Sequence, residues 1–400
     1  MKKKCVSAIL AAVMVMTLAA CAADSGTQGS TAATTQEAQQ AASEADTAQE
    51  AQQAASAETD AAPEEDTGTA AAETGERVFT DSVGREVTLP EKIERIAVSG
   101  PLAQMVLFSL APDQMVGIAT EWDKTAAEYL DTEYYNLPVL GQLYGGKGGE
   151  LNLEELLKAD PQVVIDVGEP KGSIVEDLDA LQEQTGIPFV HVTMTLSDMP
   201  EAYEMLGELL GLQEEAAERA AYCKTVYEEI SGKAASLEKK SLLLLTGEEG
   251  LNVIAKGSYH AEVIDLLADN LAVLEDPSSK GTGNEVDFEQ ILNWNPEVIL
   301  FTPDSAYDKI AMLPEWQELD AVRNGTYYEI PFGPHNWMGF YPSVQRCLGM
   351  QWMLTLLYPE EADFDLHERV AEYYRLFYHC ELTREQYDAL VADSLLKDAQ

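Results

Sequence analysis

A short unit of helix, proline turn and strand occurs twice in this chain, 135 residues apart, and it constrains the fold more than any other feature. Residues 151–165 read LNLEELLKADPQVVI, and residues 286–300 read VDFEQILNWNPEVIL. Each reads as a short amphipathic helix, a turn at Asp-Pro or Asn-Pro, and a buried strand. A generic helix–strand unit would explain part of the likeness, but the matched glutamate and proline positions favour two related lobes. One copy in each half indicates a duplication, because a solenoid needs three or more units.

Between the two copies lies one long helical pattern, from Gln213 to about Leu237. Its apolar residues recur at helical spacing and are Ala216, Ala220, Cys223, Val226, Tyr227, Ile230, Ala234 and Leu237. Glu214 and Glu215 open the stretch and Lys233 lies near its end, which suits a helix dipole. At about 1.5 Å per residue it would be roughly 37 Å long, enough to join one lobe to another.

Strands alternate with helices on both sides of this stretch, which predicts parallel, three-layer α/β lobes. Before it we expect a hairpin at 78–89, strands at 93–98, 115–119, 163–167 and 189–193, and helices at 102–110, 174–185 and 198–210. After it we expect strands at 241–245, 298–301 and 326–330, and helices at 261–268, 314–322, 343–357, 366–377 and beyond 382. The predicted organisation is a signal at 1–21, a tether at 22–76, a first lobe at 77–212, a bridging helix at 213–237, and a second lobe with terminal helices at 238–400.

The first 21 residues form a targeting segment. Three lysines precede an apolar run that is too short for a comfortable membrane span. The run ends in Leu-Ala-Ala-Cys21, which resembles a bacterial lipobox, so Cys21 is the expected lipidation site; an ordinary cleavable signal is the alternative. Residues 22–76 contain no aromatic residue, Ile, Leu, Val, Lys or Arg, and this composition predicts a disordered acidic tether.

Charge, cysteine spacing and motifs exclude several function classes. The net charge of −45 makes nucleic acid an unfavourable partner. Cys223, Cys347 and Cys380 are widely spaced, so we expect single buried thiols and neither a zinc site nor a disulfide framework. No G-x-S-x-G, H-E-x-x-H or histidine pair at metal spacing occurs, which argues against an enzyme, a resident metal and a cofactor. The alternatives of another class are a secreted metal-dependent hydrolase and a sensor or adhesion lipoprotein.

Ligands of open α/β sheets bind beyond the carboxyl ends of the strands, and two glycine-rich or aromatic loops lie there. The loop at 141–149, with Tyr144 and Lys147, could cradle an anion or could simply be flexible. The loop at 332–342 places His335, Trp337 and Tyr341 after a strand, where they would line a cleft; packing in the core is the alternative for Trp337 and Tyr341. For His335 a surface role without ligand is the alternative.

Three further residues occupy comparable positions. Trp122 and Tyr259 follow strands in opposite lobes and would face each other across the cleft, although either could pack in a core. Arg346 lies in the first turns of the next helix and could contact an anion or form a salt bridge on the helix surface. The candidate ligand-binding residues are therefore Trp122, Tyr144, Lys147, Tyr259, His335, Trp337, Tyr341 and Arg346.

The order of several segments resembles one known family. These segments are TDSVGREVTLP at 80–90 followed by IERIAV at 93–98, GELLG at 207–211, and FY with ELT between 377 and 383. Together with the two helix–Pro–strand units they resemble the substrate-binding proteins of the iron-complex and cobalamin uptake class of ABC importers. The resemblance implies a class III fold, with two lobes joined by a rigid helix and the ligand in the cleft between them.

The resemblance also implies the ligand, the partners and the location. Family members carry ferric siderophores, haem, cobalamin or oxyanions such as molybdate, and we expect a chelated metal complex, most of all a ferric one. The expected partners are an ABC permease with its ATPase, engaged by a monomer anchored through lipid outside the cytoplasm. In this family an exposed glutamate of each lobe docks into arginine pockets of the permease, and Glu154 and Glu289 match those positions. A local helix-dipole role is the alternative for both acids.

Overall fold

The computed structural model describes residues 75–144, 150–303, 305–339 and 341–395. The predicted signal segment with Cys21, the tether as far as residue 74, and Lys147 lie outside these residues. Within the described ranges no helix is both long and apolar enough to cross a membrane.

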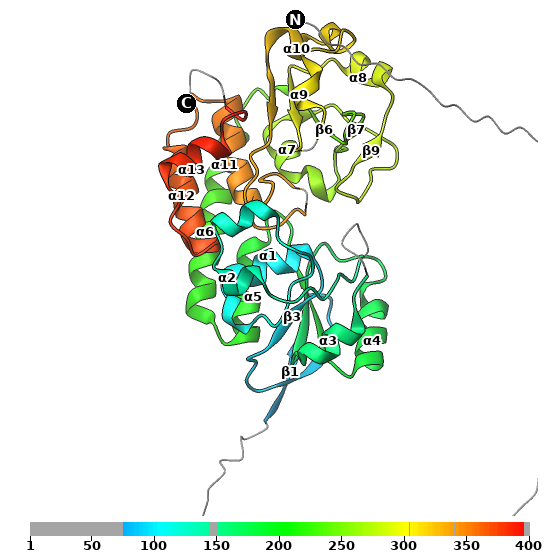
Figure 1. The fold of residues 1–400 in the computed structure, drawn as a ribbon, viewed down its shortest axis with the longest axis vertical. Coiled ribbons are helices and arrows are strands. Elements are labelled where there is room, and N and C mark those ends of the chain that lie inside the picture. The colour runs from blue at the N-terminus through cyan, green and yellow to red at the C-terminus, as the bar shows by residue number, and fades with distance from the viewer. Residues whose placement is uncertain (1–74, 145–149, 304, 340, 396–400) are drawn as a thin grey trace, which may run out of the picture. The chain divides into compact units, whose positions relative to one another are not determined.

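The first lobe is built on a three-stranded parallel sheet of order β3-β4-β5, beside an antiparallel hairpin of β1 and β2 (Figure 1). Its elements are β1 (Glu76–Thr80), β2 (Glu86–Pro90), β3 (Ile96–Val98), α1 (Pro101–Leu110), η1 (Pro112–Gln114), η2 (Lys124–Glu128), α2 (Thr132–Tyr135), α3 (Leu153–Ala159), β4 (Val163–Gly168), α4 (Ile174–Thr185), β5 (Phe189–Thr193) and α5 (Met199–Leu210). The predicted hairpin is present, and its turn contains Gly84, which has a φ of 82°.

The second lobe has a larger, mixed sheet of order β11-β10-β6-β7-β9, with β8 also paired to β6. Its elements are β6 (Ser241–Thr246), β7 (Asn252–Val253), η3 (Tyr259–Ala261), α7 (Glu262–Leu267), β8 (Asp269–Asn270), β9 (Asn284–Glu285), α8 (Phe288–Trp294), β10 (Val298–Phe301), α9 (Tyr307–Ile310), η4 (Trp316–Glu318), α10 (Asp320–Asn324) and β11 (Tyr327–Glu329). Strands β6, β10 and β11 are parallel, as predicted, whereas β7 and β9 add antiparallel pairs.

Each sheet is buried on both faces, because successive side chains of a strand point to opposite sides. In the first lobe Val164 packs toward α3 and α4, whereas Val163 and Ile165 pack toward α1 and α5. In the second lobe Leu243 and Leu245 face the layer of α8, α9 and α10, and Leu242 and Leu244 face α7. Both lobes are therefore three-layered, which confirms the predicted fold class.

The two repeat units have the same local structure. The side chain of Asn152 caps α3, and the side chain of Asp287 caps α8 at the matching position. Each helix then ends in a left-handed residue before the proline, at Asp160 with a φ of 50° and at Asn295 with a φ of 38°. Strands β4 and β10 follow, and each has a parallel strand on both sides.

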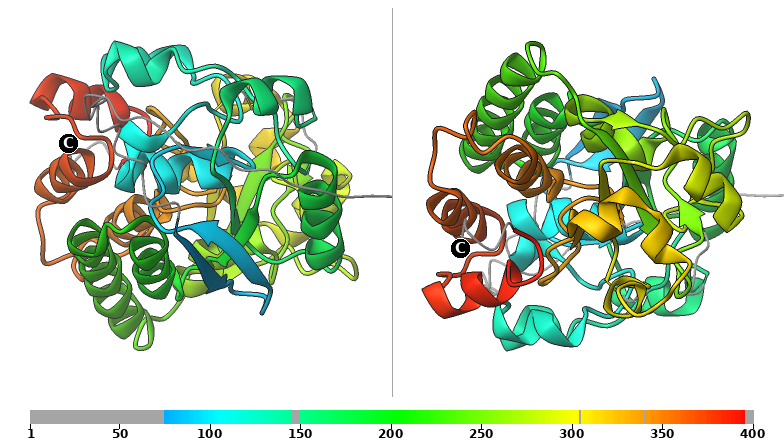
Figure 2. Two further views of the ribbon diagram at one scale, coloured as in Figure 1. Left: turned by 90° about the horizontal axis from the view of Figure 1, so that it is seen from below. Right: turned by 90° about the horizontal axis from the view of Figure 1, so that it is seen from above.

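The lobes are joined by α6 (Gln213–Ala234) and also by the helices that end the chain, α11 (Arg346–Leu357), α12 (Leu366–Phe377) and α13 (Arg384–Leu390). In both views of Figure 2 the orange and red terminal helices lie on the same side as the green pair α5 and α6. Helix α11 packs on α6, and α12 packs on α1 of the first lobe. One hydrophobic core consequently runs from the first lobe through these helices into the second.

Some predicted elements are shorter than the sequence pattern indicates. Residues 115–119 form two single bridges, Ile96 with Met115 and Ile118 with Val139, instead of a strand. The helix expected at 314–322 divides into η4 and α10, and the one expected at 261–268 is preceded by η3. Arg346, expected inside a helix that begins at 343, is the first residue of α11.

Candidate functional site

A cavity of about 490 Å³ is lined by both lobes, at the carboxyl ends of β3 and β4 in the first lobe and by loop residues in the second. The first lobe contributes Ser99, Gly100, Pro101, Leu102, Gln142, Tyr144, Asp166, Val167, Gly168, Glu169 and Lys171, and the second contributes Tyr259, His260, Ser279, Lys280, Gly281, Thr282, Tyr341 and Pro342. This position is the one expected for a ligand of α/β sheets. We refer to it as the cleft.

One wall of the cleft is the start of α1. Strand β3 ends at Val98, Gly100 is the N-cap residue, and Pro101 begins the helix. Gly100 has no side chain that could cap the first N–H groups of α1. The uncapped N–H groups and the positive end of the helix dipole therefore favour a hydrogen-bond acceptor or an anion at this end of α1.

A buried carboxylate forms part of the cleft floor. Asp166 on β4 accepts a hydrogen bond from the hydroxyl of Ser99, and its Oδ2 lies 2.7 Å from Nδ1 of His191. Asp166 and His191 are opposite each other in the parallel register of β4 and β5, which aligns the carboxylate with the ring. His191 is fully buried, and its Nε2 has no partner within the described ranges. The carboxylate is thus held in place from two strands.

Gln142 lines the cleft and is almost completely buried. Its side chain is 3% exposed, and its Nε2 has no hydrogen-bond partner among the residues that the structure describes. Gly141 precedes it with a φ of 81°, and a Cβ there would meet the carbonyl oxygen of Glu150 at 2.2 Å. Only glycine fits at 141, and this close backbone approach positions Gln142. A buried donor without a partner is costly, so an acceptor from a ligand would stabilise it.

Tyr259 is the main contribution of the second lobe. Its hydroxyl donates to the carbonyl oxygen of Met194 in the first lobe, at 2.5 Å. Burial raises the pKa of Tyr259 to about 12, so the phenol stays neutral. The Arg346 guanidinium lies over the ring, 4.8 Å from its centroid, and pairs with the carboxylate of Glu262.

Tyr144, Tyr341 and His260 complete the aromatic lining. The Tyr144 hydroxyl donates to Asp177 at 3.0 Å, and burial raises the pKa of both Tyr144 and Tyr341. Tyr341 has a φ of 64°, a left-handed conformation that costs free energy for a bulky residue and is concentrated at functional sites. Burial lowers the pKa of His260, whose Nδ1 lies 2.7 Å from the carbonyl oxygen of Gly339.

Both signs of charge occur around the cleft. In the first lobe Nζ of Lys171 lies 3.5 Å from Oε2 of Glu169. In the second lobe Lys280 is exposed. With Asp166 these groups give the lining two cations and two carboxylates, so its formal charges balance. No three His, Cys, Asp or Glu side chains of the described chain come together as a metal-binding group.

Three predicted ligand residues do not line the cleft, and their predicted positions are wrong. Trp337 is 0% exposed and belongs to the core. Trp122 is buried too, with its ring edge-on to Phe108 at 5.3 Å between centroids. His335 packs on Trp122 with ring centroids 5.4 Å apart, and burial lowers its pKa to about 4. The loop after β11 turns Trp337 and His335 inward, because burying these rings in the core removes more surface from water than a cleft would.

Arg346 does not line the cavity and forms the alternative salt bridge, with Glu262, buried instead of on the helix surface. It is 1% exposed and lies behind Tyr259, so it contacts a lining residue instead of the cavity. Tyr144, Tyr259 and Tyr341 do line the cleft, and their contact with a ligand stays a prediction. Lys147 lies outside the described residues. Glu154 and Glu289 are exposed in the first turns of α3 and α8 and are not among the residues that line the cavity.

Asp166 and Gln142 were not predicted. A signal for Asp166 exists, since it is the one charged residue in the buried strand VVIDVG and lies in register with the one polar ring of FVHVT. Nothing in the sequence distinguishes Gln142 from other loop amides, because its burial depends on the approach of Glu150 to Gly141.

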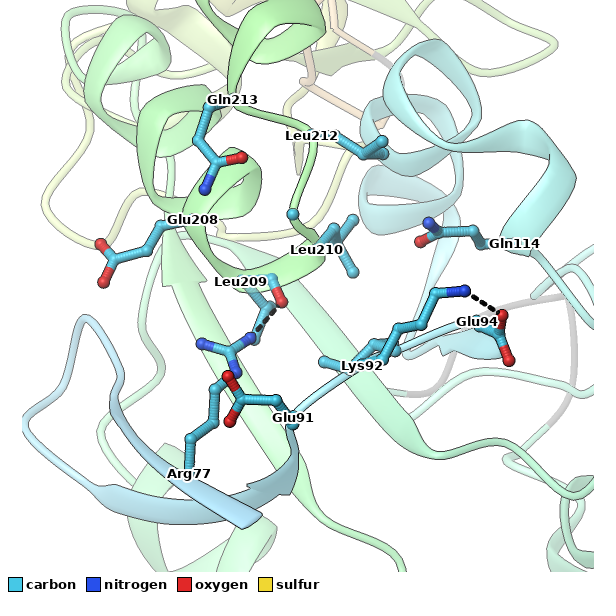
Figure 3. A pocket seen from close by; sticks show the side chains of 12 residues that line it. Arg77, Glu91, Lys92, Glu94, Gln114, Glu208, Leu209, Leu210, Leu212 and Gln213 are labelled. Carbon is cyan, nitrogen blue, oxygen red and sulfur yellow. Dashed lines mark hydrogen bonds and ion pairs between the residues drawn. The ribbon is translucent and has the colours of Figure 1, made fainter. Parts of the chain in front are cut away.

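A second cavity, of about 610 Å³, lies at the turn between α5 and α6 (Figure 3). Arg77 donates to the carbonyl oxygen of Leu209 there, and Lys92 pairs with Glu94 at 2.5 Å. These cations are already engaged by protein groups, and the lining comes from one lobe. The smaller cleft is the better candidate site, because it joins both lobes and holds an unpaired buried donor.

Comparisons with known proteins agree with this arrangement. A family model described as Periplasmic binding protein matches residues 106–333. The molybdate-binding protein MolA of Haemophilus influenzae is 24% identical over 337 residues, which cover 76% of this chain and 91% of that protein. An ABC transporter solute binding protein from Sulfurospirillum deleyianum is 27% identical with a TM-score of 0.73, covering 79% of this chain and 99% of that one. A periplasmic solute binding protein from Veillonella parvula is 25% identical with a TM-score of 0.66, covering 80% and 98%.

Proposed function

Because this chain belongs to the periplasmic binding protein family, we propose that it is the solute-binding component of an ABC importer and that its solute is a chelated metal complex. The role places it outside the cytoplasm, as for its relatives. The observation that carries the proposal is the cleft itself, which both lobes line and whose volume of about 490 Å³ lies within the usual range for small-molecule sites.

The lining has the chemistry that a metal chelate needs. Tyr144, Tyr259 and Tyr341 present neutral aromatic surface to the ligand body. Lys171 and Lys280 offer positive charge to anionic chelating groups at the rim. We propose a ferric complex first, with cobalamin and haem as alternatives within the same class.

A bare oxyanion such as molybdate is the second candidate, and one observation favours it. Gln142, whose Nε2 has no partner among the described residues, and the start of α1 line the same cavity, and together they would hold an anion. The relative from Haemophilus influenzae is named for molybdate. The carboxylate of Asp166 opposes this reading, because a like charge in the cleft repels a small anion.

Titration of the purified protein tests the proposal. Ferric siderophores, haem, cobalamin and molybdate are each added while heat of binding is recorded, and native mass spectrometry of protein from its own host identifies any bound chelate. We expect saturable binding of one chelate, weakened when Tyr341 is replaced by Ala. Tyr307→Ala is the control, since Tyr307 lies on α9 away from the cleft. Binding of sugars or free amino acids instead would contradict the ligand class, and chemical conversion of the ligand would favour the hydrolase alternative.

The permease contact rests on Glu154 and Glu289, which we propose as the docking acids. Both are exposed, and α3 and α8 lie on the side of the folded unit away from α12 and α13 (Figure 1). Equivalent positions in two related lobes present one charge to each half of a two-fold partner. The protein then acts as a monomer, which sedimentation analysis would test.

Membrane anchoring through Cys21 is a further proposal, motivated by the Leu-Ala-Ala-Cys segment. Replacing Cys21 by Ser should release the protein from the membrane or leave it unprocessed. Membrane retention with normal processing of that variant would show that the anchor lies elsewhere.

A further inference from the structure

Two cysteines from distant parts of the chain meet in the core. Cys223 lies on α6, Cys347 lies in the first turn of α11, and their Sγ atoms are 3.9 Å apart although the residues are 124 positions apart. They are 1% and 0% exposed. The third described cysteine, Cys380, follows α12 and is half-buried.

The pair lies at the contact between the bridging helix α6 and the helix α11 that follows the second lobe. The chain leaves the end of α6, builds the whole second lobe, and returns to α6 at the start of α11. Cys223 and Cys347 therefore lie where the returning chain contacts the bridging helix. Arg346, next to Cys347, stacks on the cleft residue Tyr259.

We propose that Cys223 and Cys347 form a disulfide that fastens α11 to α6. The proposal rests on the extracytoplasmic location in the proposed function, because dithiols are oxidised in such compartments. The Sγ atoms must approach from 3.9 Å to the bonding distance of about 2.05 Å, a movement within reach of side-chain rotation and a small helix shift.

The chemistry requires a disulfide oxidant, R–S–S–R, such as an oxidised dithiol protein or glutathione disulfide. One cysteine thiolate attacks the oxidant, forms a mixed disulfide and releases R–SH. The second thiolate then displaces the remaining R–S group, which leaves as R–SH with the second proton. The two cysteine sulfurs lose two electrons and the oxidant gains them. The reaction must precede the packing of α11 on α6, because in the folded protein both thiols are buried and burial raises the pKa of Cys223.

The cross-link has a defined effect on the protein. It closes the loop that contains the second lobe, which removes conformational freedom from the unfolded chain and stabilises the folded one. It also ties the helix that carries Arg346 to the bridging helix, and so restrains the ring of Tyr259 in the cleft. Cys380 has no part in this and remains a thiol.

The test uses the exported full-length protein purified without reductant, denatured in an alkylating reagent and mapped by peptide mass. We expect linked peptides containing Cys223 and Cys347, and alkylated Cys380. Reduction should lower the thermal midpoint by several degrees in the wild type and in Cys380→Ala, but leave the double variant Cys223→Ala, Cys347→Ala unchanged. As a second arm, unfolded protein is refolded with glutathione disulfide, which should restore the same linkage.

Alkylation of both Cys223 and Cys347 in the exported protein and after refolding would overturn the proposal, whatever ligand the protein binds. Linked cysteines without any ligand binding would instead overturn the proposed function. The two hypotheses therefore fail separately.

Discussion

The guanidinium of Arg346 lies 4.8 Å from the centroid of the Tyr259 ring, across 87 positions of sequence. The same ring donates its hydroxyl hydrogen to Met194 of the first lobe, and the same guanidinium pairs with Glu262. A ring that lines the cleft is thus held from behind by a buried cation and from the opposite lobe by a carbonyl oxygen. Arg346 positions the ring instead of meeting a ligand itself.

Replacing Arg346 by Ala should lower both stability and ligand affinity. Removing one partner of a buried ion pair costs about 3–5 kcal/mol, and because Glu262 is 27% exposed we expect about 2–3 kcal/mol here. Urea unfolding measures the first effect and calorimetric titration the second. Arg323→Ala on the surface of α10 is the control. Unchanged ligand affinity in folded Arg346→Ala would show that the Tyr259 ring does not need the Arg346 guanidinium to hold its position.

The cleft tyrosines should contribute directly to binding. Replacing Tyr341 by Ala removes aromatic surface, and we expect affinity to fall by about 1–3 kcal/mol if the ring is buried against the ligand. Stability should change little, because the left-handed backbone at 341 is unfavourable for Ala as well as for Tyr. Titration of folded variants at 144, 259 and 341 checks this. Equal affinity of all three variants and wild type would refute the cleft as the binding site.

Trp337 should behave in the opposite way. It is fully buried, so Trp337→Ala should destabilise the protein by about 3–5 kcal/mol through the cavity it leaves. Trp337→Phe keeps most of the volume and should give folded protein with wild-type ligand affinity. Denaturant unfolding and titration of the Phe variant separate the two effects. A large loss of ligand affinity in well-folded Trp337→Phe would indicate instead that Trp337 contacts the ligand.

His335 predicts a pH dependence of stability. Burial lowers its pKa to about 4 in the folded protein, against about 6.5 when unfolded. Below pH 6.5 the unfolded chain binds the proton first, so stability is complete above 6.5 and is lost as the pH falls toward 4. The loss should be on the order of 3 kcal/mol. His335→Gln should flatten this part of the curve of unfolding free energy against pH. Parallel curves for both proteins would mean that His335 does not titrate there.

The docking acids predict a salt-dependent transport defect. Replacing Glu154 and Glu289 together by Ala should leave ligand affinity unchanged and weaken permease-stimulated ATPase activity, most of all at low ionic strength where ion pairs contribute most. Glu368 and Glu385 are matched controls, since both are exposed in the first turns of terminal helices. Full ATPase stimulation by the double variant would leave Glu154 and Glu289 as helix-end residues only.

Local patterns decided much of the fold before any tertiary contact. Asn152 and Asp287 cap their helices through their own side chains. Asp160 and Asn295 take the left-handed conformation, which Asp and Asn tolerate better than most residues, before a proline that disfavours further helix. Residues a few positions apart contain this information, so the two helix–Pro–strand units could be read from the chain. The bridging helix was predictable for the same reason and ends at Ala234, three residues before its predicted end.

The sequence by itself therefore determined the two α/β lobes, the helix between them and the edge of the sheets where a cleft would form. Tertiary structure decided which rings face that cleft. Tyr259 and Trp337 both follow strands, yet only the first lines the cavity, because Trp337 has a core available behind the loop. Tertiary structure also placed Cys223 beside Cys347 and aligned Asp166 with His191. Such pairs depend on how distant helices and strands pack, and helical or strand periodicity carries no information about partners so far along the chain.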